Sequence, residues 1–311
     1  MKDELVSAVV ITRNRRKDLT DCVNSLLKSD YKNIEIIVID NGSDEPINNW
    51  FKGKFPRVKL ITSTKNLGAA GGRNLGIEYC SGTHILFMDD DAIAEAKMIS
   101  SLVRILKKDK LTGIVQPIIY DKFQKKLLDG AGHDISLLTG RIKAWGAKEK
   151  DLGQYNFLRE IPLSGCIWMV KKDVINKIGN YDERYFIPYE DSDFSFRAKK
   201  AGFKIYCVPQ AIAWHKGRKS KFVNPYIELI GITSLERAFR ISRNKLIYLS
   251  KNAPSFHFLF FFLLIQPLYL TAHSLIIIFS LRFDILIKYW QGVFAGWFWA
   301  FLIKTNLDKI L

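Results

Sequence analysis

Cysteine is scarce in this chain, and its few cysteines do not lie at metal-binding spacing. The 311 residues include four, Cys22, Cys80, Cys166 and Cys207, and no CxxC pair. A zinc cage or a disulfide framework would need cysteines in clusters or at recurring spacings, so the sequence favours neither. Such a chain suits a reducing compartment.

The sequence also shows no apolar leader, internal repeat or low-complexity linker. Residues 1–4 lead directly into a β-rich segment at residues 6–12. Because a signal peptide would need an apolar stretch and a cleavage site, we expect this part of the chain to remain in the cytoplasm. The length suffices for one substantial α/β domain with a core of its own, together with an appendage.

Acidic residues are few compared with basic ones. The chain has 47 Lys and Arg residues against 31 Asp and Glu residues, a formal net charge of +16. A nucleic acid, an anionic membrane or a phosphorylated substrate would each suit that charge. No recognised nucleic-acid-binding motif accompanies it, and much of it lies beside an apolar segment, so we expect no nucleic-acid partner.

Alternating strands and helices make up the first part of the chain. The expected strands cover residues 5–12, 34–40, 58–63 and 84–90, and the expected helices cover residues 13–28 and 69–80. Short apolar runs predict the strands, and apolar residues at helical spacing predict the first helix. The strand–helix–strand order is typical of a parallel sheet with right-handed crossovers. We therefore expect an α/β fold with a Rossmann-like, mainly parallel central sheet flanked by helices.

The following part is expected to be less regular. A helix at residues 95–108 and a strand at 113–120 precede residues 121–159, which are rich in Gly and Lys and predict loops and short antiparallel strands. Order returns with a strand and a helix within residues 161–179, a helix at 190–202 and a strand at 203–209. Acidic residues open the helix at 190–202, and Gly202 closes it.

Three aspartates, Asp89, Asp90 and Asp91, stand at the end of a predicted strand. Three adjacent like charges are costly unless a cation or several backbone donors offset them. In an extended segment Asp89 and Asp91 lie on one face, so both can reach a hard divalent cation that also binds diphosphate oxygens. Asp90 would point elsewhere, towards a ribose for example. Capping of the next helix is the alternative interpretation.

A glycine-rich segment at residues 66–74, NLGAAGGRN, opens a predicted helix. Exposed amides and the Arg73 side chain at the start of a helix could hold a phosphate. Small residues that let a helix pack closely on a sheet would produce the same composition, so the segment alone leaves both interpretations open. It has neither the GxGxxG spacing of dinucleotide sites nor the GK[ST] of a P-loop.

A second acidic group, Glu190, Asp191 and Asp193, lies at the start of another predicted helix. One of these carboxylates, for which we choose Asp191, could serve as a general base, although helix capping would need only one of the three. His215 follows a predicted strand and could complete a metal site as a neutral ligand. A lone histidine is more often structural.

Six segments resemble, in the same order, the motifs of family 2 glycosyltransferases: VVITRNR, VIDNGS, NLGAAGGRN, FMDDDA, PYEDSDFSFRAKKAG and AWH. The match spans roughly residues 5–217, and the nearest likeness is to bacterial rhamnosyltransferases and galactofuranosyltransferases. The resemblance implies a GT-A fold and an inverting mechanism. The QxxRW motif of processive synthases is missing from this region, so addition of one or a few sugars is expected.

The resemblance also implies roles for individual residues. Thr12, Arg13, Asn14 and Asp40 would contact the base and ribose of a nucleotide-sugar donor, and Asn66, Gly71 and Arg73 would form the donor loop. Asp89 and Asp91 correspond to the DXD motif that binds Mn²⁺ or Mg²⁺ with His215, and Asp89 and Asp90 would also face the donor. Asp191 corresponds to the catalytic base, Glu190 would help to bind the acceptor, and Gly165, Cys166 and Trp168 resemble the acceptor-side wall.

The end of the chain has a different character. Residues 216–251 hold roughly nine Lys or Arg residues against two Glu, and residues 256–281 carry no formal charge. The uncharged run exceeds the roughly 20 residues that span a bilayer. Gln266, Pro267 and His273 interrupt it, so a kinked or re-entrant helical hairpin competes with a clean span.

These patterns predict three parts: a GT-A domain at residues 1–220, a basic amphipathic helical connector at 221–255, and membrane-associated hydrophobic helices at 256–311. Residues 289–303 add Trp290, Trp297 and Trp299, which suit the headgroup level. Basic residues would face anionic lipid or a phosphorylated lipid carrier, namely Lys216, Arg218, Lys219, Lys221, Arg237, Arg240 and Arg243. A helical lid used for dimerisation is the alternative to membrane insertion.

The sequence therefore predicts a metal-dependent inverting hexosyltransferase at the cytoplasmic face of the cell membrane. It would move rhamnose, galactofuranose or a similar sugar from a nucleotide diphosphate donor to a hydroxyl of a lipid-linked saccharide acceptor, in cell-surface polysaccharide biosynthesis. One alternative is a polyprenyl-phosphate glycosyltransferase resembling dolichol-phosphate-mannose synthase, whose pattern lacks the AGGRN loop and the late histidine. The other, a nucleotidyltransferase, is disfavoured by the EDSDF and AWH segments. No oligomeric state is indicated.

Overall fold

The computed structural model describes residues 4–124, 126–217 and 224–306, and the chain divides into two compact units. The first unit consists of Met1–Asp134, Lys143–Phe186 and Glu190–Gly217, and the second of Ile135–Ile142, Ile187–Tyr189 and Arg218–Leu311. Arg218, Lys219 and Lys221, expected at a lipid surface, lie outside the described residues. The predicted three-part division of the chain stays a prediction.

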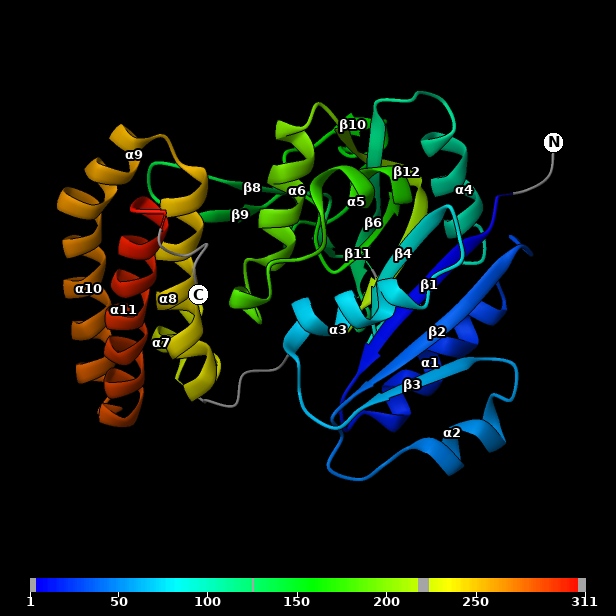
Figure 1. Ribbon diagram of the computed structural model, residues 1–311, viewed down its shortest axis with the longest axis horizontal. Coiled ribbons are helices and arrows are strands. Elements are labelled where there is room, and N and C mark those ends of the chain that lie inside the picture. Colours follow the sequence, from blue (N-terminus) through cyan, green and yellow to red (C-terminus); the bar gives the residue numbers. More distant parts are fainter. Residues whose placement is uncertain (1–3, 125, 218–223, 307–311) are drawn as a thin grey trace. The chain divides into compact units, whose positions relative to one another are not determined.

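One large, mostly parallel sheet forms the centre of the first unit (Figure 1). Its main path runs in the order β10-β12-β6-β11-β4-β1-β2-β3. These strands are β1 (Val6–Thr12), β2 (Ile34–Asn41), β3 (Lys59–Ser63), β4 (His84–Asp89), β6 (Thr112–Asp121), β10 (Arg159–Glu160), β11 (Ile167–Lys171) and β12 (Lys204–His215). Strands β1 to β4 are mutually parallel, and β11 runs antiparallel to both β4 and β6. The predicted Rossmann-like sheet is confirmed.

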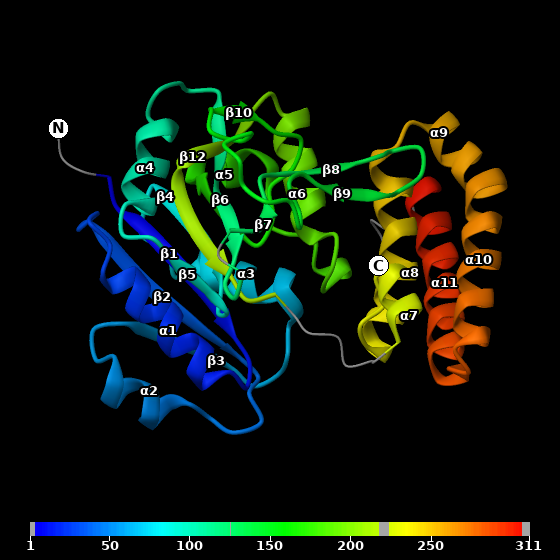
Figure 2. The same ribbon diagram turned by 180° about the vertical axis from the view of Figure 1, so that it is seen from behind.

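Helices cover both faces of this sheet (Figures 1 and 2). One face carries α1 (Arg16–Leu27), α2 (Asn48–Lys54) and α4 (Met98–Leu106), and the other carries α3 (Gly68–Glu78), α5 (Lys172–Ile178) and α6 (Glu190–Lys200). Alternate residues of β1 therefore enter different cores: Val10 packs with the first set and Val9 with the second. Coverage of both faces explains why central strands such as β1 and β4 are apolar along most of their length. Helix α2 was not predicted.

The glycines of α3 allow close contact with the sheet. A Cβ atom added at Gly76 would lie 2.4 Å from Val9 Cγ1, and one added at Gly72 would lie 3.1 Å from Ile11 Cγ2. No larger side chain fits at Gly76 without displacing β1 or the helix. These two glycines thus serve packing, one of the two interpretations that the sequence left open.

Short strands fill the region that was expected to be irregular. They are β5 (Ala92–Ala94), which pairs with β12 and was not predicted, β7 (Leu128–Gly130), which pairs with β6, and the separate pair β8 (His133–Ile135) and β9 (Ile142–Ala144). A 3₁₀ turn, Glu183–Tyr185, precedes α6. The antiparallel bridge between Leu127 and Lys150, and the antiparallel pairing of β7 with β6, agree with the short antiparallel strands expected there.

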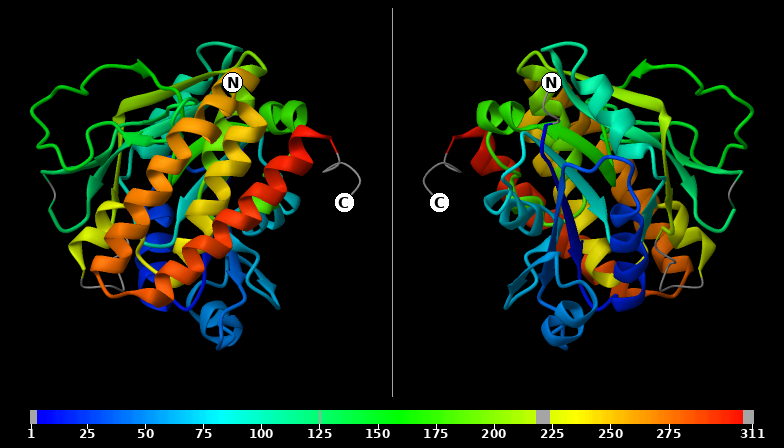
Figure 3. Two further views of the ribbon diagram at one scale, coloured as in Figure 1. Left: turned by 90° about the vertical axis from the view of Figure 1, so that its left-hand side faces the viewer. Right: turned by 90° about the vertical axis from the view of Figure 1, so that its right-hand side faces the viewer.

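Helices alone make up most of the second unit, and Figure 3 shows its three longest segments side by side. The elements of this unit after residue 224 are α7 (Pro225–Leu229), α8 (Leu235–Asn252), α9 (Ser255–Phe260), a π-helical turn (Phe261–Ile265), α10 (Gln266–Phe279) and α11 (Phe283–Lys304). The stretch Ser255–Phe279 is one continuous helix. Among the described residues it alone is long and apolar enough to cross a membrane, and 17% of its most apolar window is buried.

Two glycines bring α11 against α8. A Cβ atom added at Gly292 would lie 2.1 Å from the carbonyl oxygen of Phe239, and one added at Gly296 would lie 3.1 Å from Arg243 Cα. The spacing of four residues places both glycines on the same face of α11. Small residues at this spacing allow two helix backbones to approach closely.

Candidate active site

The carboxyl ends of the strands bring the predicted site residues to one edge of the sheet. Thr12 at the end of β1 pairs with Asp40 of β2, and Ile11 pairs with Asp89 at the end of β4. His215, the last residue of β12, pairs with the first residue of β5, directly after the three aspartates. In open α/β sheets this edge is where ligands bind.

Asp89, Asp91 and His215 form a compact group of ligand atoms. One atom from each of the three side chains lies within 4.8 Å of the other two. His215 Nε2 is 3.1 Å from Asp91 Oδ1 and 4.0 Å from Asp89 Oδ2. The Asp91 side chain is 3% exposed and the Asp89 side chain 43% exposed, so solvent reaches the group from the side of Asp89. Two carboxylates and an imidazole suit a divalent cation such as Mn²⁺.

Asp90 has partners of its own, and it lies with Asp91 in the turn after β4 and not in an extended segment. Its Oδ2 accepts a hydrogen bond of 2.7 Å from Thr12 Oγ1, and its Oδ1 accepts one of 3.0 Å from Arg15 Nη1. Burial raises the pKa of Asp90 to about 6 against the opposing influence of Arg15. The hydroxyl of Thr12 thus already has a partner in the protein. A contact of Thr12 or Asp90 with the nucleotide-sugar donor stays a prediction.

Arg15 is a site residue that the sequence analysis missed. Its Nη1 contacts both Asp90 and Asp91, and the distance to Asp91 Oδ2 is 2.8 Å. Arg15 follows Arg13 and Asn14 in the loop after β1, and the basic residues Arg16 and Lys17 open α1 directly after it. A surplus of positive charge next to three aspartates was the available signal.

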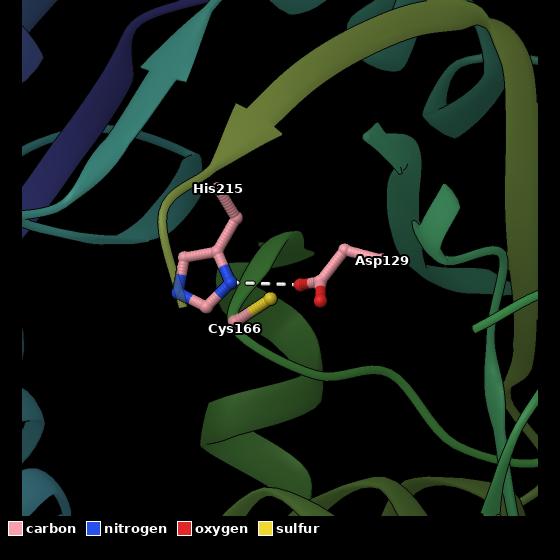
Figure 4. Close-up of side chains that lie close together, drawn as sticks. All are labelled: Asp129, Cys166 and His215. Atoms are coloured by element: carbon pink, nitrogen blue, oxygen red, sulfur yellow. Dashed lines mark hydrogen bonds and ion pairs between the residues drawn. The ribbon is translucent and has the colours of Figure 1, made fainter. Parts of the chain in front are cut away.

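Asp129 also contacts the site and was not predicted. His215 Nδ1 lies 2.7 Å from Asp129 Oδ2 (Figure 4). Burial lowers the pKa of His215, but hydrogen bonds to Asp129 and Asp91 outweigh it and raise the pKa to about 10. Without a metal the imidazole is therefore a cation between two carboxylates. A carboxylate on Nδ1 is the usual partner that fixes the orientation of a metal-binding histidine.

Arg73 contacts a second set of carboxylates. Its Nη1 is 3.0 Å from Glu190 Oε1 and 2.5 Å from Asp191 Oδ1, and its Nη2 is 3.6 Å from Asp89 Oδ1. The guanidinium side chain is 5% exposed. It is thus engaged with carboxylates and not displayed at the helix start as a free phosphate-binding group, which was one of the sequence interpretations.

Asp191 and Glu190 occupy the first turn of α6, where carboxylates are favoured by the helix dipole. Burial raises the pKa of both side chains, although the charge of Arg73 opposes the shift. Asp191 remains 19% exposed, whereas Glu190 is 5% exposed. Of the two carboxylates, Asp191 is the more exposed, and the predicted roles of both residues stay predictions. Asp193 is fully buried and pairs with Arg197 at 2.8 Å, a structural role.

The remaining predicted donor residues lie at the same edge and contact the loops there. Arg13 Nε donates to the carbonyl of Gly42 at 2.9 Å, and Asn14 Nδ2 donates to Asp44 at 2.7 Å. Both side chains thus connect the loops after β1 and β2. Their roles in binding a base stay predictions.

Asp40, Asn66 and Gly71 are placed by local contacts. Asp40 is 1% exposed and accepts a hydrogen bond from the Ser43 amide, while its Oδ2 is buried without a partner among the described atoms. Asn66 Oδ1 accepts a hydrogen bond from the Gly68 amide at the start of α3. Gly71 lies within α3 itself.

The acceptor-side residues separate into two environments. Gly165 lies against the ring of His133, where an added Cβ atom would be 2.9 Å from Cε1. Trp168 is fully buried and packs on Phe87 and Phe194, with ring centroids 5.1 and 5.2 Å away. Its ring cannot touch an acceptor in this conformation. Trp168 is thus a core residue in this structure, and its predicted contact with an acceptor stays a prediction.

Comparison with known proteins decides the family. Residues 7–179, more than half of the chain, match the family model described as Glycosyl transferase family 2. The protein is a family 2 glycosyltransferase. The resemblance noted in the sequence is thereby confirmed.

Two curated relatives extend over larger parts of this glycosyltransferase. The glycosyltransferase GlyG of Streptococcus pneumoniae serotype 4 is 28% identical over 193 residues, 59% of this chain and 62% of GlyG. The dTDP-rhamnosyl transferase RfbF of Shigella flexneri is 26% identical over 260 residues, 79% of this chain and 80% of RfbF. The matched region is thus less than two thirds of GlyG.

Solved structures share the fold. The crystal structure of GalNAc-T7 with UDP, GalNAc and Mn²⁺ superposes with a TM-score of 0.60 at 15% sequence identity. The superposition covers 78% of this glycosyltransferase and 51% of the GalNAc-T7 chain. A likeness at this identity concerns the fold alone, and it confirms the predicted GT-A architecture.

Proposed function

We propose that this glycosyltransferase moves a sugar from a nucleotide diphosphate donor to an acceptor hydroxyl by a single, inverting displacement that depends on a divalent metal ion. The observation that carries the proposal is the convergence of Asp89, Asp91 and His215 at one end of the sheet, next to the partly exposed Asp191. A metal group and a candidate base beside each other are the two parts that such a displacement needs.

The metal ligands fit Mn²⁺ or Mg²⁺ by their chemistry. Asp89 and Asp91 offer carboxylate oxygens, and His215 offers Nε2, at separations that one ion can bridge after small side-chain movements. Like charges this close favour a bound cation. A divalent ion held there would offset the negative charge that develops on the departing nucleoside diphosphate.

Asp191 is the proposed general base. The acceptor oxygen forms a bond to the anomeric carbon, the bond from that carbon to the diphosphate breaks, and Asp191 takes the hydroxyl proton. Burial makes the carboxylate a stronger base, and Arg73 holds it in position through its Nη1 contact. Arg73 would thus act on the base through this contact, and its contact with the donor stays a prediction.

Features of the second unit are evidence that the acceptor is linked to a membrane. The continuous helix Ser255–Phe279 has the length and composition of a membrane segment, and large apolar side chains along it are exposed, such as Leu263, Leu264 and Leu268. An exposed apolar surface of this kind marks a partner that is itself apolar. We propose that the protein acts at the cytoplasmic membrane face on a lipid-linked saccharide in polysaccharide biosynthesis. RfbF makes a dTDP-rhamnose donor the first to test.

Transfer assays with Asp191→Asn test the proposed base. With donors chosen by thermal-shift screening of UDP-, dTDP- and GDP-sugars with Mn²⁺, this variant should bind donor normally and lose transfer, and EDTA should abolish transfer by the wild type. Undiminished turnover by Asp191→Asn would contradict the assignment. Asp173→Asn, at the start of α5, is the matched control and should transfer sugar like the wild type.

Membrane association is tested with vesicles of anionic lipid. The full-length protein should sediment with them and remain in the pellet after an alkaline wash, because buried apolar area holds it there and not charge alone. Release by the wash would favour the helical lid over insertion.

A further inference from the structure

His215 belongs to a second group of ligand atoms, formed with Asp129 and Cys166 (Figure 4). The carboxylate oxygen, thiol sulfur and imidazole nitrogen all lie within 4.8 Å of one another. The three residues come from β7, from the loop before β11 and from the end of β12. By residue exposure, each of the three is partly buried.

The donor atoms of this group differ in kind from those around Asp89. One sulfur, one nitrogen and one oxygen atom form a softer set, which favours Zn²⁺ over Mn²⁺ or Mg²⁺. Zinc bonds of about 2.0–2.3 Å place the ligand atoms of a tetrahedral site about 3.5 Å apart, so the side chains need to move by about 1 Å. Cys166 is a free cysteine whose sulfur has no hydrogen-bond partner among the described residues, so no hydrogen bond has to break when the sulfur binds an ion.

We propose that Asp129, Cys166 and His215 form a zinc site with water as the fourth ligand, and that zinc bound there excludes the activating ion from Asp89 and Asp91. Binding would release the proton of the Cys166 thiol and a proton of the imidazole to solvent. The zinc site stands on its own geometry, whereas the exclusion rests on the function proposed above.

The exclusion follows from the chemistry of one imidazole ring. Figure 4 shows His215 Nδ1 directed at Asp129, and Nε2 is the atom that lies 3.1 Å from Asp91. A neutral imidazole has a lone pair on one nitrogen and a proton on the other. Zinc on Nδ1 therefore leaves Nε2 protonated, and a protonated nitrogen cannot bind a second metal ion. His215 can complete either group of ligands, but not both.

Cobalt titration tests the zinc site on the full-length protein. Co²⁺ occupies zinc sites, and a cobalt–thiolate bond gives an intense near-ultraviolet charge-transfer absorption. We expect this absorption in the wild type, its loss when Zn²⁺ is added, and its loss in Cys166→Ser. Cys22→Ser removes a buried thiol from α1 and should keep it. Absorption that persists in Cys166→Ser, or is missing from the wild type, would overturn the site.

Alkylation of the unmodified protein gives a second measurement that does not depend on any variant folding. Zinc should slow the reaction of Cys166 with iodoacetamide, as followed by peptide mass spectrometry, whereas Mn²⁺ at the same concentration should not. An unchanged rate with zinc present would equally overturn the site.

Manganese binding, followed by electron paramagnetic resonance, tests the exclusion. One equivalent of zinc should raise the apparent Kd for Mn²⁺ by more than about tenfold in the wild type and leave it unchanged in Cys166→Ser. Equal Mn²⁺ affinity with and without zinc overturns the exclusion but leaves the proposed function intact. No Mn²⁺ binding in the zinc-free protein overturns the proposed metal site instead, and the cobalt result still decides the zinc site.

Discussion

Two groups of carboxylates meet at Asp89, and different cations neutralise them. Glu190 and Asp191 contact Arg73, a permanent cation that is 5% exposed. Asp91 contacts Arg15 and His215, and the second of these loses its charge when it gives up a proton. The negative charge of the Arg73 group is thus neutralised by a side chain of the protein that does not lose its own charge. The His215 group contains a cation that a metal ion can replace, which is the property a cofactor site needs.

The largest effect should come from removing Arg73. Arg73→Met leaves Glu190 and Asp191 buried without their cation, and we expect the free energy of unfolding to fall by about 3–5 kcal/mol in denaturant titrations. Arg13→Met, which breaks an exposed contact with Asp44, is the matched control and should cost about 1 kcal/mol or less. Equal losses of unfolding free energy in the two variants would contradict the view that Arg73 is needed to neutralise a buried group of carboxylates.

The second largest effect should come from substituting a residue that contacts the metal ion directly. Asp91→Asn removes a carboxylate that faces His215 and Arg15, and we expect Mn²⁺ affinity to fall by more than about 100-fold, beyond the effect of losing a supporting residue. Isothermal titration calorimetry measures this loss. Asp173→Asn, at the start of α5, retains all the ligands and serves as the control. Unchanged affinity in Asp91→Asn would exclude this aspartate from the metal group.

Removing the Asp129 carboxylate that contacts His215 should lower Mn²⁺ affinity less than removing Asp91 does. Asp129→Asn keeps a hydrogen-bond acceptor but removes the charge beside Nδ1, and Mn²⁺ affinity should fall by about 10–100-fold. The same calorimetric titration, with Asp134→Asn as a nearby acidic control, measures it. A loss as large as that of Asp91→Asn would mean that Asp129 is itself a ligand.

Arg15 should give the smallest effect, and one of opposite sign in two measurements. Arg15→Met removes a cation that competes with metal for Asp91, so Mn²⁺ should bind more tightly. The metal-free protein should lose about 1 kcal/mol of stability, because Arg15 is 30% exposed and its ion pairs are partly screened. Calorimetry and denaturant titration of the same variant measure both. Weaker metal binding would contradict competition between Arg15 and the ion.

The sequence predicted those site residues whose position depends on strand ends. Asp89 and His215 end the apolar strands β4 and β12, and Asp91 lies two residues after Asp89. Parallel pairing with β1 places the end of β4 at the carboxyl edge of the sheet, and antiparallel pairing with β5 places His215 there. Arg15 and Asp129 lie in a loop and in a strand of three residues, where no periodicity indicates which way a side chain points. Their contacts depend on tertiary packing that a pattern does not contain.

The positions of Arg73 and Trp168 also differ from what the sequence suggested, for two physical reasons: the orientation of a helix about its axis and the burial of a strand on both faces. Arg73 faces carboxylates because Gly72 and Gly76 turn one face of α3 onto the sheet, which the composition of the segment does not specify. Trp168 lies in a strand covered on both faces, so alternation along β11 does not distinguish a core residue from a substrate contact. Helix α2 has seven residues, too few for a clear period.

The glycine contact between α8 and α11 bears on how this protein can be produced for study. Deleting α11 as a dispensable tail would uncover the face of α8 that Gly292 and Gly296 approach, and a shortened protein of that kind would aggregate. The apolar side chains that face outward from α11, such as Phe294, Phe298 and Phe301, are the ones to exchange for polar residues. Detergent-free preparation therefore calls for redesigning the surface of the last helix while keeping its full length.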